Sequence, residues 1–262
     1  MQGARWESGQ DDSPMFDCAS GAFWHNDDCP DLFDNTTHRM LSYDVGASAY
    51  YAASADALAV LASAIGRPAD AASLTARADA MRSLMQAHLW DSSRGVFADL
   101  FLLNSSISHR ISPTSFYALL AHAASDAQAD QMISEWAFNA SRFCLSATWP
   151  QGVDDTCYWG LPSISADDPA YPPLGYWRGF VWGPMHMLTW WSFREYSHLP
   201  TVSAARAQLA VQAAATVVNQ YRRNRHVCEN FSPWRNATDC SGSNFYHWGA
   251  LGALLPLLEA GF

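Results

Sequence analysis

The sequence predicts an all-α fold in which consecutive helices pair as hairpins. Long alanine-rich segments carry apolar residues at helical spacing, and no long segment alternates polar and apolar residues as a strand would. The connections between the helical segments are alternately short and long. Helix pairs joined in this way are typical of a toroid, with the long loops gathered at one end.

The first predicted hairpin covers residues 43–65 and 69–90, and its turn holds Gly66 and Pro68, two residue types that end helices. Apolar residues recur at helical spacing along the second segment. His88 falls on that stripe, which predicts a core histidine rather than a ligand. A DSSRG turn then leads into a short predicted strand, VFADL.

Five further helical segments follow this hairpin. Their predicted ranges are 113–124, 127–138, 179–196, 201–222 and 245–260. Three loops rich in Trp, Asp, Gly and Pro stand out, at residues 5–40, 145–180 and 224–247. Because binding and catalytic residues concentrate on loops held by a rigid scaffold, we expect function there.

Composition restricts the class of protein. A chain of 262 residues, 49% of them hydrophobic, can bury one sizeable core, so residues 1–262 are predicted to form a single domain. The formal net charge of −10 argues against a nucleic-acid partner. No run of 18 apolar residues exists to cross a membrane. The 12 Trp, 10 Tyr and 13 Phe either stack on sugar rings or fill a large core.

The cysteines and asparagines indicate an oxidising compartment. Three local disulfides are predicted: Cys18 with Cys29, Cys144 with Cys157, and Cys228 with Cys240. Five N-x-S/T sequons begin at Asn35, Asn104, Asn139, Asn230 and Asn236. We therefore expect a disulfide-bonded glycoprotein of the secretory pathway or extracellular space, although no signal peptide is visible. The alternative is a cytosolic protein with free thiols.

Carboxylates join aromatic residues in each long loop. The first reads RWESGQDDSP and the third contains CENFSPW. Cleavage of a glycosidic bond needs one carboxylic acid to protonate the leaving oxygen and a second carboxylate to activate water or attack the sugar. Asp11 or Asp12 from the first loop and Glu229 from the third meet this requirement.

Three motifs, in order, resemble those of glycoside hydrolase family 63. They are W-E-S-G-x-D-x-S-P, then G-L-P-S-x-x-x-D-D-P-A-x with Y-W-R-G-x-x-W, then E-N-F with F-Y-H-W-G. That family contains processing α-glucosidase I enzymes and microbial relatives that act on small α-glucosides and α-mannosides. The trehalases share a looser version of the first and third blocks. The motifs span residues 5–249, nearly the whole chain.

The resemblance implies an (α/α)6 barrel, an inverting mechanism and a set of site residues. Asp11 matches the general acid and Glu229 the general base. Tyr176, Trp177, Arg178 and Gly179 match the block that walls the sugar subsite. Pocket roles are also implied for Trp6, Trp182, Tyr246, His247 and Trp248. Two carboxylates suffice for this chemistry, so no metal or organic cofactor is expected.

Several of these residues have an alternative structural interpretation. Glu7 and Asp12 are interpreted as loop partners, and Asp167 with Asp168 as turn formers before Pro169. Arg178 either donates to sugar hydroxyls or pairs with an acid in the interior. A packing role is predicted for His186. His247 stays ambiguous, because it lies among aromatic residues near the predicted base.

Two departures from the family pattern stand out. An (α/α)6 barrel needs twelve helices, and about seven are predicted here. The acid loop begins at residue 5, whereas in the family it lies in the middle of the barrel. The chain is therefore expected to be the C-terminal part of the catalytic barrel, with missing helices preceding the acid loop.

The expected function is that of an inverting, exo-acting α-glycosidase that removes terminal α-linked glucose from an oligosaccharide or small glucoside. A trehalase-like or α-mannoside hydrolase on the same barrel is one alternative. The other is a truncated, non-catalytic remnant that binds carbohydrate without turnover.

Overall fold

The computed structural model describes residues 9–17, 32–34, 36–145, 160–171, 175–233, 240–244 and 246–262. Within these ranges the fold is helical, as predicted, with seven α-helices and only short strands. The helices are α1 (Val45–Ala64), α2 (Pro68–His88), α3 (Tyr117–Leu120), α4 (Asp126–Met132), α5 (Gly183–Glu195), α6 (Pro200–Asn224) and α7 (Leu251–Glu259).

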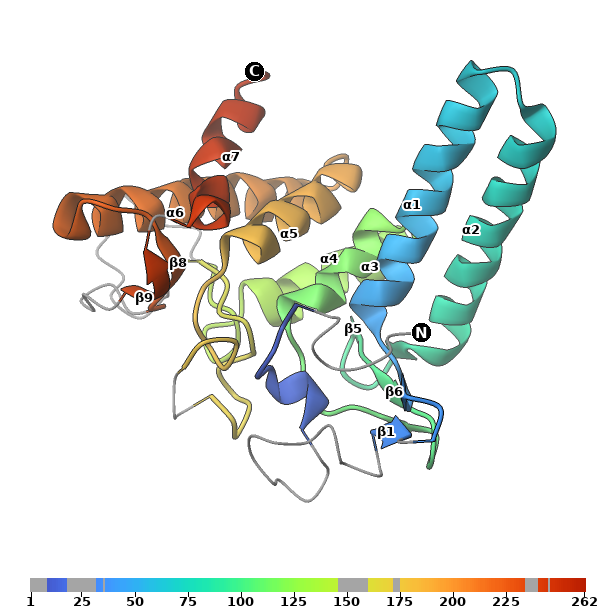
Figure 1. Ribbon diagram of the computed structural model, residues 1–262, viewed down its shortest axis with the longest axis horizontal. Helices are drawn as coiled ribbons and strands as arrows, with labels where there is room; N and C mark the ends of the chain where they lie inside the picture. Colours follow the sequence, from blue (N-terminus) through green and yellow to red (C-terminus); the bar gives the residue numbers. More distant parts are fainter. Residues whose placement is uncertain are drawn as a thin grey trace.

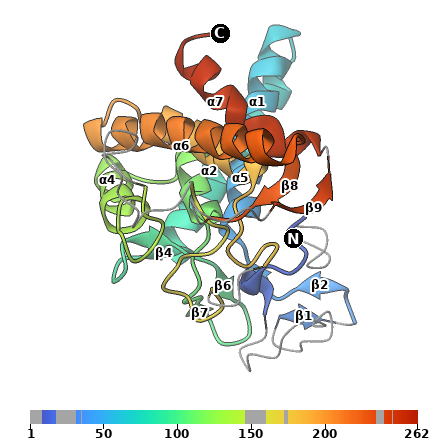
Figure 2. The same ribbon diagram turned by 90° about the vertical axis from the view of Figure 1, so that its left-hand side faces the viewer.

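The helices pack as neighbours along the chain. Helices α1 and α2 form a long antiparallel hairpin, and α1 also contacts α3 (Figure 1). Helix α6 packs against α5 and α7 and reaches α4 (Figure 2). The segment of residues 9–17 lies below the helices in Figure 1, at the end where α1 begins. This end also carries the short strands near α1, so it is where connecting segments meet.

Local chemistry explains the α1–α2 hairpin. The Asp44 carboxylate caps α1 by accepting a hydrogen bond from the Ala47 amide at 2.5 Å. Gly66 follows α1 with φ of 74°, a conformation that favours glycine, and Pro68 starts α2. The buried stripe of α1 consists mostly of alanines, which let the two helices approach closely. The predicted core position of His88 is wrong, because that residue is exposed at the last turn of α2.

Short antiparallel strands tie the loops together. The pairs are β1 (Phe33–Asp34) with β2 (Arg39–Met40), and β4 (Trp90–Asp91) with β5 (Val96–Phe97). Strand β6 (Leu100–Phe101) lies between β3 (Ser42–Tyr43) and β7 (Ser106–Ile107). The longest pair, β8 (Cys228–Phe231) with β9 (Cys240–Asn244), was not predicted from the sequence. Four or five residues are too few to show a clear alternation in a sequence rich in turn-forming residues.

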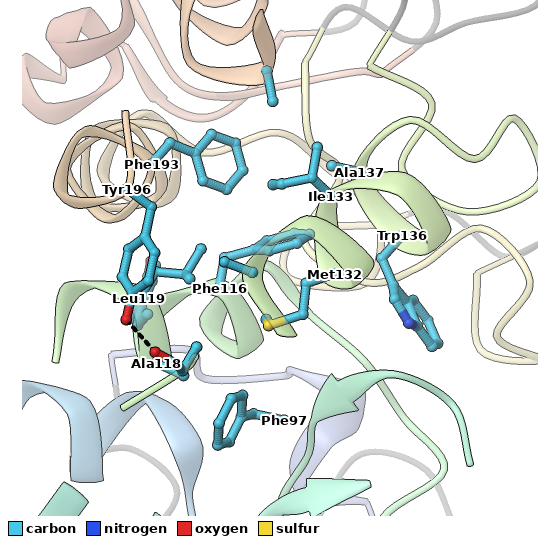
Figure 3. Packing of buried hydrophobic residues seen from close by; sticks show 14 of the residues in the cluster. Phe97, Phe116, Ala118, Leu119, Met132, Ile133, Trp136, Ala137, Phe193 and Tyr196 are labelled. Atoms are coloured by element: carbon cyan, nitrogen blue, oxygen red, sulfur yellow. Dashed lines mark hydrogen bonds between the residues drawn. The ribbon is translucent and has the colours of Figure 1, made fainter. Parts of the chain in front are cut away.

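The main core lies where α3, α4 and α5 meet (Figure 3). Phe116 packs edge-on against Phe143 and Phe193, with ring centroids 5.6 and 5.4 Å apart. The Tyr196 hydroxyl donates a hydrogen bond to the Ala124 carbonyl, so its polar tip is satisfied within this core. The predicted helix at 127–138 is α4 continued by a π-helical turn, Ile133–Ala137.

Two carboxyl groups meet at the start of α1. The Val45 amide donates to Asp99 at 2.8 Å, one residue after the capping Asp44. Burial raises the pKa of Asp44, and burial together with the charge of Asp44 raises the pKa of Asp99 well above its ordinary value. Asp99 is therefore the member of the pair that keeps its proton more readily.

Replacing Asp99 by Asn should stabilise the protein at neutral pH. A raised folded-state pKa means that the stability contribution of this acid is complete below about pH 4 and is lost as the pH rises through that pKa. Asn keeps the acceptor for Val45 and cannot ionise. The free energy of unfolding should rise by on the order of 1 kcal/mol at pH 7.5 and change little at pH 4, as measured by urea denaturation.

The control for this measurement is Asp130→Asn, which removes an exposed acid on α4 and should have little effect at either pH. A loss of stability in Asp99→Asn that is equal at both pH values would show that the two carboxyl groups do not share the cost of ionisation.

Cysteines and sequons are described only in part. Cys144 and Cys228 are disulfide-bonded, whereas Cys18, Cys29, Cys157 and the side chain of Cys240 lie outside the described residues. The predicted pairings and glycosylation therefore stay predictions.

By length and mean hydropathy (1.2) alone, α1 could cross a membrane, which is weak evidence because core helices of soluble proteins meet the same test.

Candidate active site

The acid-bearing segment is fastened to the Y-W-R-G block by Asp12. The Asp12 carboxylate accepts a hydrogen bond from the Trp177 amide at 2.9 Å, and its carbonyl accepts one from the Arg178 guanidinium at 3.0 Å. This anchoring agrees with the loop role predicted for Asp12. Within the described part of the chain no hydrogen bond holds the neighbouring Asp11 carboxylate, which is half-buried. Asp12 thus belongs to the scaffold, and Asp11 keeps its carboxylate available.

Arg178 strengthens the same connection from the interior. Its guanidinium donates two hydrogen bonds to the Asp17 carboxylate, at 3.0 and 2.6 Å, and both side chains are almost completely buried. Arg110 lies 3.5 Å from Asp17 and bonds Asp168 at 2.9 Å. The Arg178 guanidinium therefore pairs with Asp17 in the interior. This contact favours the structural interpretation of Arg178 over the predicted contact with sugar hydroxyls.

Glu229 is held by three elements around it. It lies on β8 and is 7% exposed. One carboxylate oxygen accepts a hydrogen bond from the Tyr176 hydroxyl at 2.7 Å, and the other accepts one from the Ser243 amide at 2.7 Å. A Cβ on Gly242 would collide with the Glu229 carboxylate, so only glycine fits there. The strand pairing of β8 with β9 thus orients this carboxylate.

Tyr176 brings the predicted acid and the predicted base into one electrostatic environment. Burial raises its pKa, and the hydrogen bond and charge of Glu229 and the charges of Asp11 and Asp12 raise it further. Tyr176 therefore stays protonated and donates to Glu229 from a backbone with φ of 36°. Glu229 from the third loop is hydrogen-bonded to this hydroxyl, and the charges of Asp11 and Asp12 from the first loop act on it. The pairing of Asp11 with Glu229 as acid and base stays a prediction.

An aromatic cluster forms the wall beside these groups. Trp177 stacks on Trp182 with ring centroids 3.6 Å apart, and Trp248 meets Trp182 edge-on at 5.8 Å. Trp182 is fully buried and supports the Trp177 ring through this stacking. The pocket role predicted for Trp182 stays a prediction. Tyr246 stacks on the exposed ring of His247.

Other predicted residues occupy the surroundings of the site. The Gly179 amide donates to the Ser163 hydroxyl at 2.9 Å, which fixes the backbone behind Arg178. His186 is buried as predicted, and its burial lowers its pKa to about 4. Asp168 accepts a hydrogen bond from the Ala170 amide at 2.8 Å, as predicted for a turn. Trp6 lies outside the described residues.

A cavity of about 460 Å3 adjoins the acid-bearing segment. Its lining comes from the acid-bearing segment, from the N-terminal parts of α1 and α5, from the residues around α3, and from two tryptophans. These residues are Gly9, Gln10, Asp44, Gly46, Ala47, Tyr50, Thr114, Tyr117, Trp177, Pro184, Met185, Leu188 and Trp248. Sequence reasoning missed Asp44 and Tyr50 in this lining, because an acid before a helix predicts only a cap. Within the described ranges, no three His, Cys, Asp or Glu side chains gather closely enough to hold a metal ion.

Structures of known proteins share this fold. The GH63 mannosylglycerate hydrolase from Thermus thermophilus in complex with glucose is 19% identical, with a TM-score of 0.69, over 97% of this chain and 61% of that chain. The same enzyme with Tris and D-glycerate is 20% identical, with a TM-score of 0.69, over 97% and 64%. Neutral trehalase Nth1 from Saccharomyces cerevisiae is 18% identical, with a TM-score of 0.62, over 87% and 40%.

The chain thus spans less than two thirds of the length of these solved structures, and at such identities the likeness shows the fold alone. No curated protein matches the chain. The family model of the mannosylglycerate hydrolase MGH1-like glycoside hydrolase domain matches residues 1–249, which cover all three motifs and confirm the predicted resemblance to family 63. The chain therefore belongs to the MGH1-like glycoside hydrolases and carries a glycoside hydrolase domain of the GH63 type.

Proposed function

We propose that the protein is an inverting, exo-acting α-glycosidase that removes terminal α-linked glucose from an oligosaccharide or a small glucoside. Asp11 serves as general acid and Glu229 as general base. The observation that carries this proposal is the Tyr176 hydroxyl, which hydrogen-bonds Glu229 and also lies within the electrostatic influence of Asp11.

The contacts of Glu229 suit a base. Each of its two carboxylate oxygens accepts one hydrogen bond, which fixes the plane of the group and leaves a further lone pair on each oxygen for a water molecule. Glu229 would take a proton from that water as it attacks the anomeric carbon. Asp11 would pass its proton to the glycosidic oxygen as the bond to that carbon breaks. Room for the water requires the two carboxyl groups to lie about 6.5–9.5 Å apart.

The wider arrangement of the protein follows from the same proposal. The helix pairs form part of an (α/α)6 toroid, whose long loops carry the site. Exposed apolar side chains at the C-terminal end of α1 support this arrangement, since Leu61 and the capping residue Ile65 are 60% and 70% exposed and offer a face for further helices. The predicted secretory or extracellular location also stays part of the proposal. It requires Asn230 to be unmodified, because that residue is fully buried beside Glu229.

The stereochemistry of the first product tests the mechanism. The purified protein should release glucose from an α-glucoside, and proton NMR should detect the β-anomer before mutarotation. An α-anomer as first product would show that the anomeric configuration is retained. The roles assigned to Asp11 and Glu229 in an inverting mechanism would then be wrong.

A substrate panel separates the alternative functions. Trehalose and an α-mannoside, compared with an α-glucoside at equal concentration, distinguish the trehalase-like and mannoside alternatives from the proposed α-glucosidase. Mannosylglycerate belongs in the panel because a structural neighbour is named for it. Sugar binding without turnover of any member would identify the non-catalytic alternative.

A further inference from the structure

The cavity beside the acid-bearing segment has walls of different chemistry. Trp177 and Trp248 supply aromatic rings to its lining. Asp44, which caps α1, and Tyr50 within α1 also line it, as do Gly9 and Gln10, which directly precede Asp11. A volume of about 460 Å3 falls within the range of small-molecule sites.

Position assigns this cavity to one end of the substrate. A general acid protonates the oxygen of the leaving group, so the leaving group lies on the side of the acid. Gly9 and Gln10, which directly precede Asp11 in the chain, line the cavity, whereas Glu229 does not and neither does the Asp11 side chain, so the cavity lies next to the acid-bearing segment. The group that occupies it is therefore the one that departs, and the hydrolytic water lies toward Glu229.

The charge of the cavity decides what the leaving group can be. Asp44 is the only charged side chain among the described lining residues, and neither Lys nor Arg is among them. Burial and the charge of Asp44 raise the pKa of Tyr50 to about 12, so this hydroxyl is neutral at physiological pH. The carboxyl group of Asp99 lies behind the same helix terminus and adds no positive charge. The described wall thus offers the Asp44 carboxylate, the hydroxyl groups of Tyr50, Thr114 and Tyr117, and aromatic faces. Among its described residues there is no cation to neutralise an anion.

We propose that this cavity is the leaving-group subsite and that Asp44 makes it select a neutral, hydroxyl-bearing aglycone over an anionic one such as glycerate. This inference rests on the proposed glycosidase function. A hydroxyl can donate a hydrogen bond to the Asp44 carboxylate, and the C–H face of a polyol or sugar can lie against Trp177. A carboxylate in the same place would meet a like charge in a partly buried site, where repulsion is poorly screened.

Two glucosides that differ only in the aglycone charge test the proposal. Glucosylglycerol and glucosylglycerate should be compared by kcat/KM and by the quenching of tryptophan fluorescence, since Trp177 and Trp248 line the cavity. The protein should prefer glucosylglycerol by at least about 30-fold. Asp44→Asn keeps a side-chain oxygen to cap α1 and removes the charge. This variant should narrow the preference by about 10-fold or more, chiefly by gaining efficiency and affinity for the anionic glucoside.

Asp70→Asn is the matched control. Asp70 is also an acid in the first turn of a helix, but it lies at the far end of the α1–α2 hairpin and does not line this cavity. Its replacement should leave the preference unchanged. Circular dichroism of Asp44→Asn should retain the helical signal, so that a changed preference reports charge rather than unfolding.

The outcomes separate the inference from the proposed function. If both glucosides are hydrolysed equally well, or if Asp44→Asn changes both equally, the subsite assignment is overturned while the glycosidase function stands. If neither glucoside is hydrolysed, the proposed glycosidase function fails. The fluorescence titration then tests by itself whether the cavity selects a neutral aglycone. A neutral preference in binding that Asp44→Asn abolishes then supports the selectivity of the cavity, and equal binding, or none, overturns it.

Discussion

Asp11→Asn and Glu229→Gln should each lower the turnover of an α-glucoside by on the order of 100-fold or more, the scale of general acid–base catalysis. Both changes preserve shape and remove the ionisable group. Neither should greatly alter folding. Asp11 is half-buried, and the amide oxygen of Gln can accept from the Ser243 amide while its NH2 group donates to the Tyr176 hydroxyl oxygen. The measurement is kcat for each variant, with urea denaturation to confirm that stability is kept.

Asp12→Asn is the matched control for the acid. The Asp12 carboxylate accepts from the Trp177 amide, and the side-chain oxygen of Asn can do the same. Turnover should therefore fall only slightly. If Asp12→Asn abolishes turnover while Asp11→Asn preserves it, the general acid is Asp12 and the proposed roles of the two neighbours must be exchanged.

The long helices could be predicted because local signals and tertiary packing agree there. Residues 43–65 and 201–222 are alanine-rich, and the structure has Val45–Ala64 and Pro200–Asn224. The predicted helix at 113–124 is instead a 3-10 turn at Pro113–Phe116 followed by four α-helical residues. Its residues are nearly all buried, so packing on every side removes the periodic pattern that marks an amphipathic helix.

The site could be predicted only where a motif marks it. The motifs identify Asp11, Glu229 and the Y-W-R-G block, but they do not show which side chains face the cavity. Trp182 and Arg178 are motif residues, but their side chains are buried. Trp182 packs against Trp177, and Arg178 pairs with Asp17. Asp44 is no part of a quoted motif and still lines the cavity. Such positions depend on pairing between residues far apart in sequence, as in the 161 positions that separate Asp17 from Arg178.

Arg178→Met should lower the free energy of unfolding by about 3 kcal/mol, because it leaves a buried carboxylate without its main partner. The Arg178 and Asp17 side chains are 3% and 1% exposed, and two hydrogen bonds join them. Loss of a buried partner typically costs about 3–5 kcal/mol. The lower end of that range applies here, because Arg110 stays 3.5 Å from Asp17.

The same pair connects the acid-bearing segment to the Y-W-R-G block, so its loss should also affect the site. Once Arg178 is removed, Asp12 keeps its contact with the Trp177 amide but loses the guanidinium on its carbonyl, and Asp11 is held less firmly. Urea denaturation should therefore show the loss of stability, and kcat should fall even where the variant is folded. Arg67→Met is the matched control, because Arg67 pairs with Asp70 at the surface with 66% of its side chain exposed. Such a pair contributes about 0–1 kcal/mol. Equal effects of the two substitutions would show that the buried pair does not hold the acid-bearing segment in place.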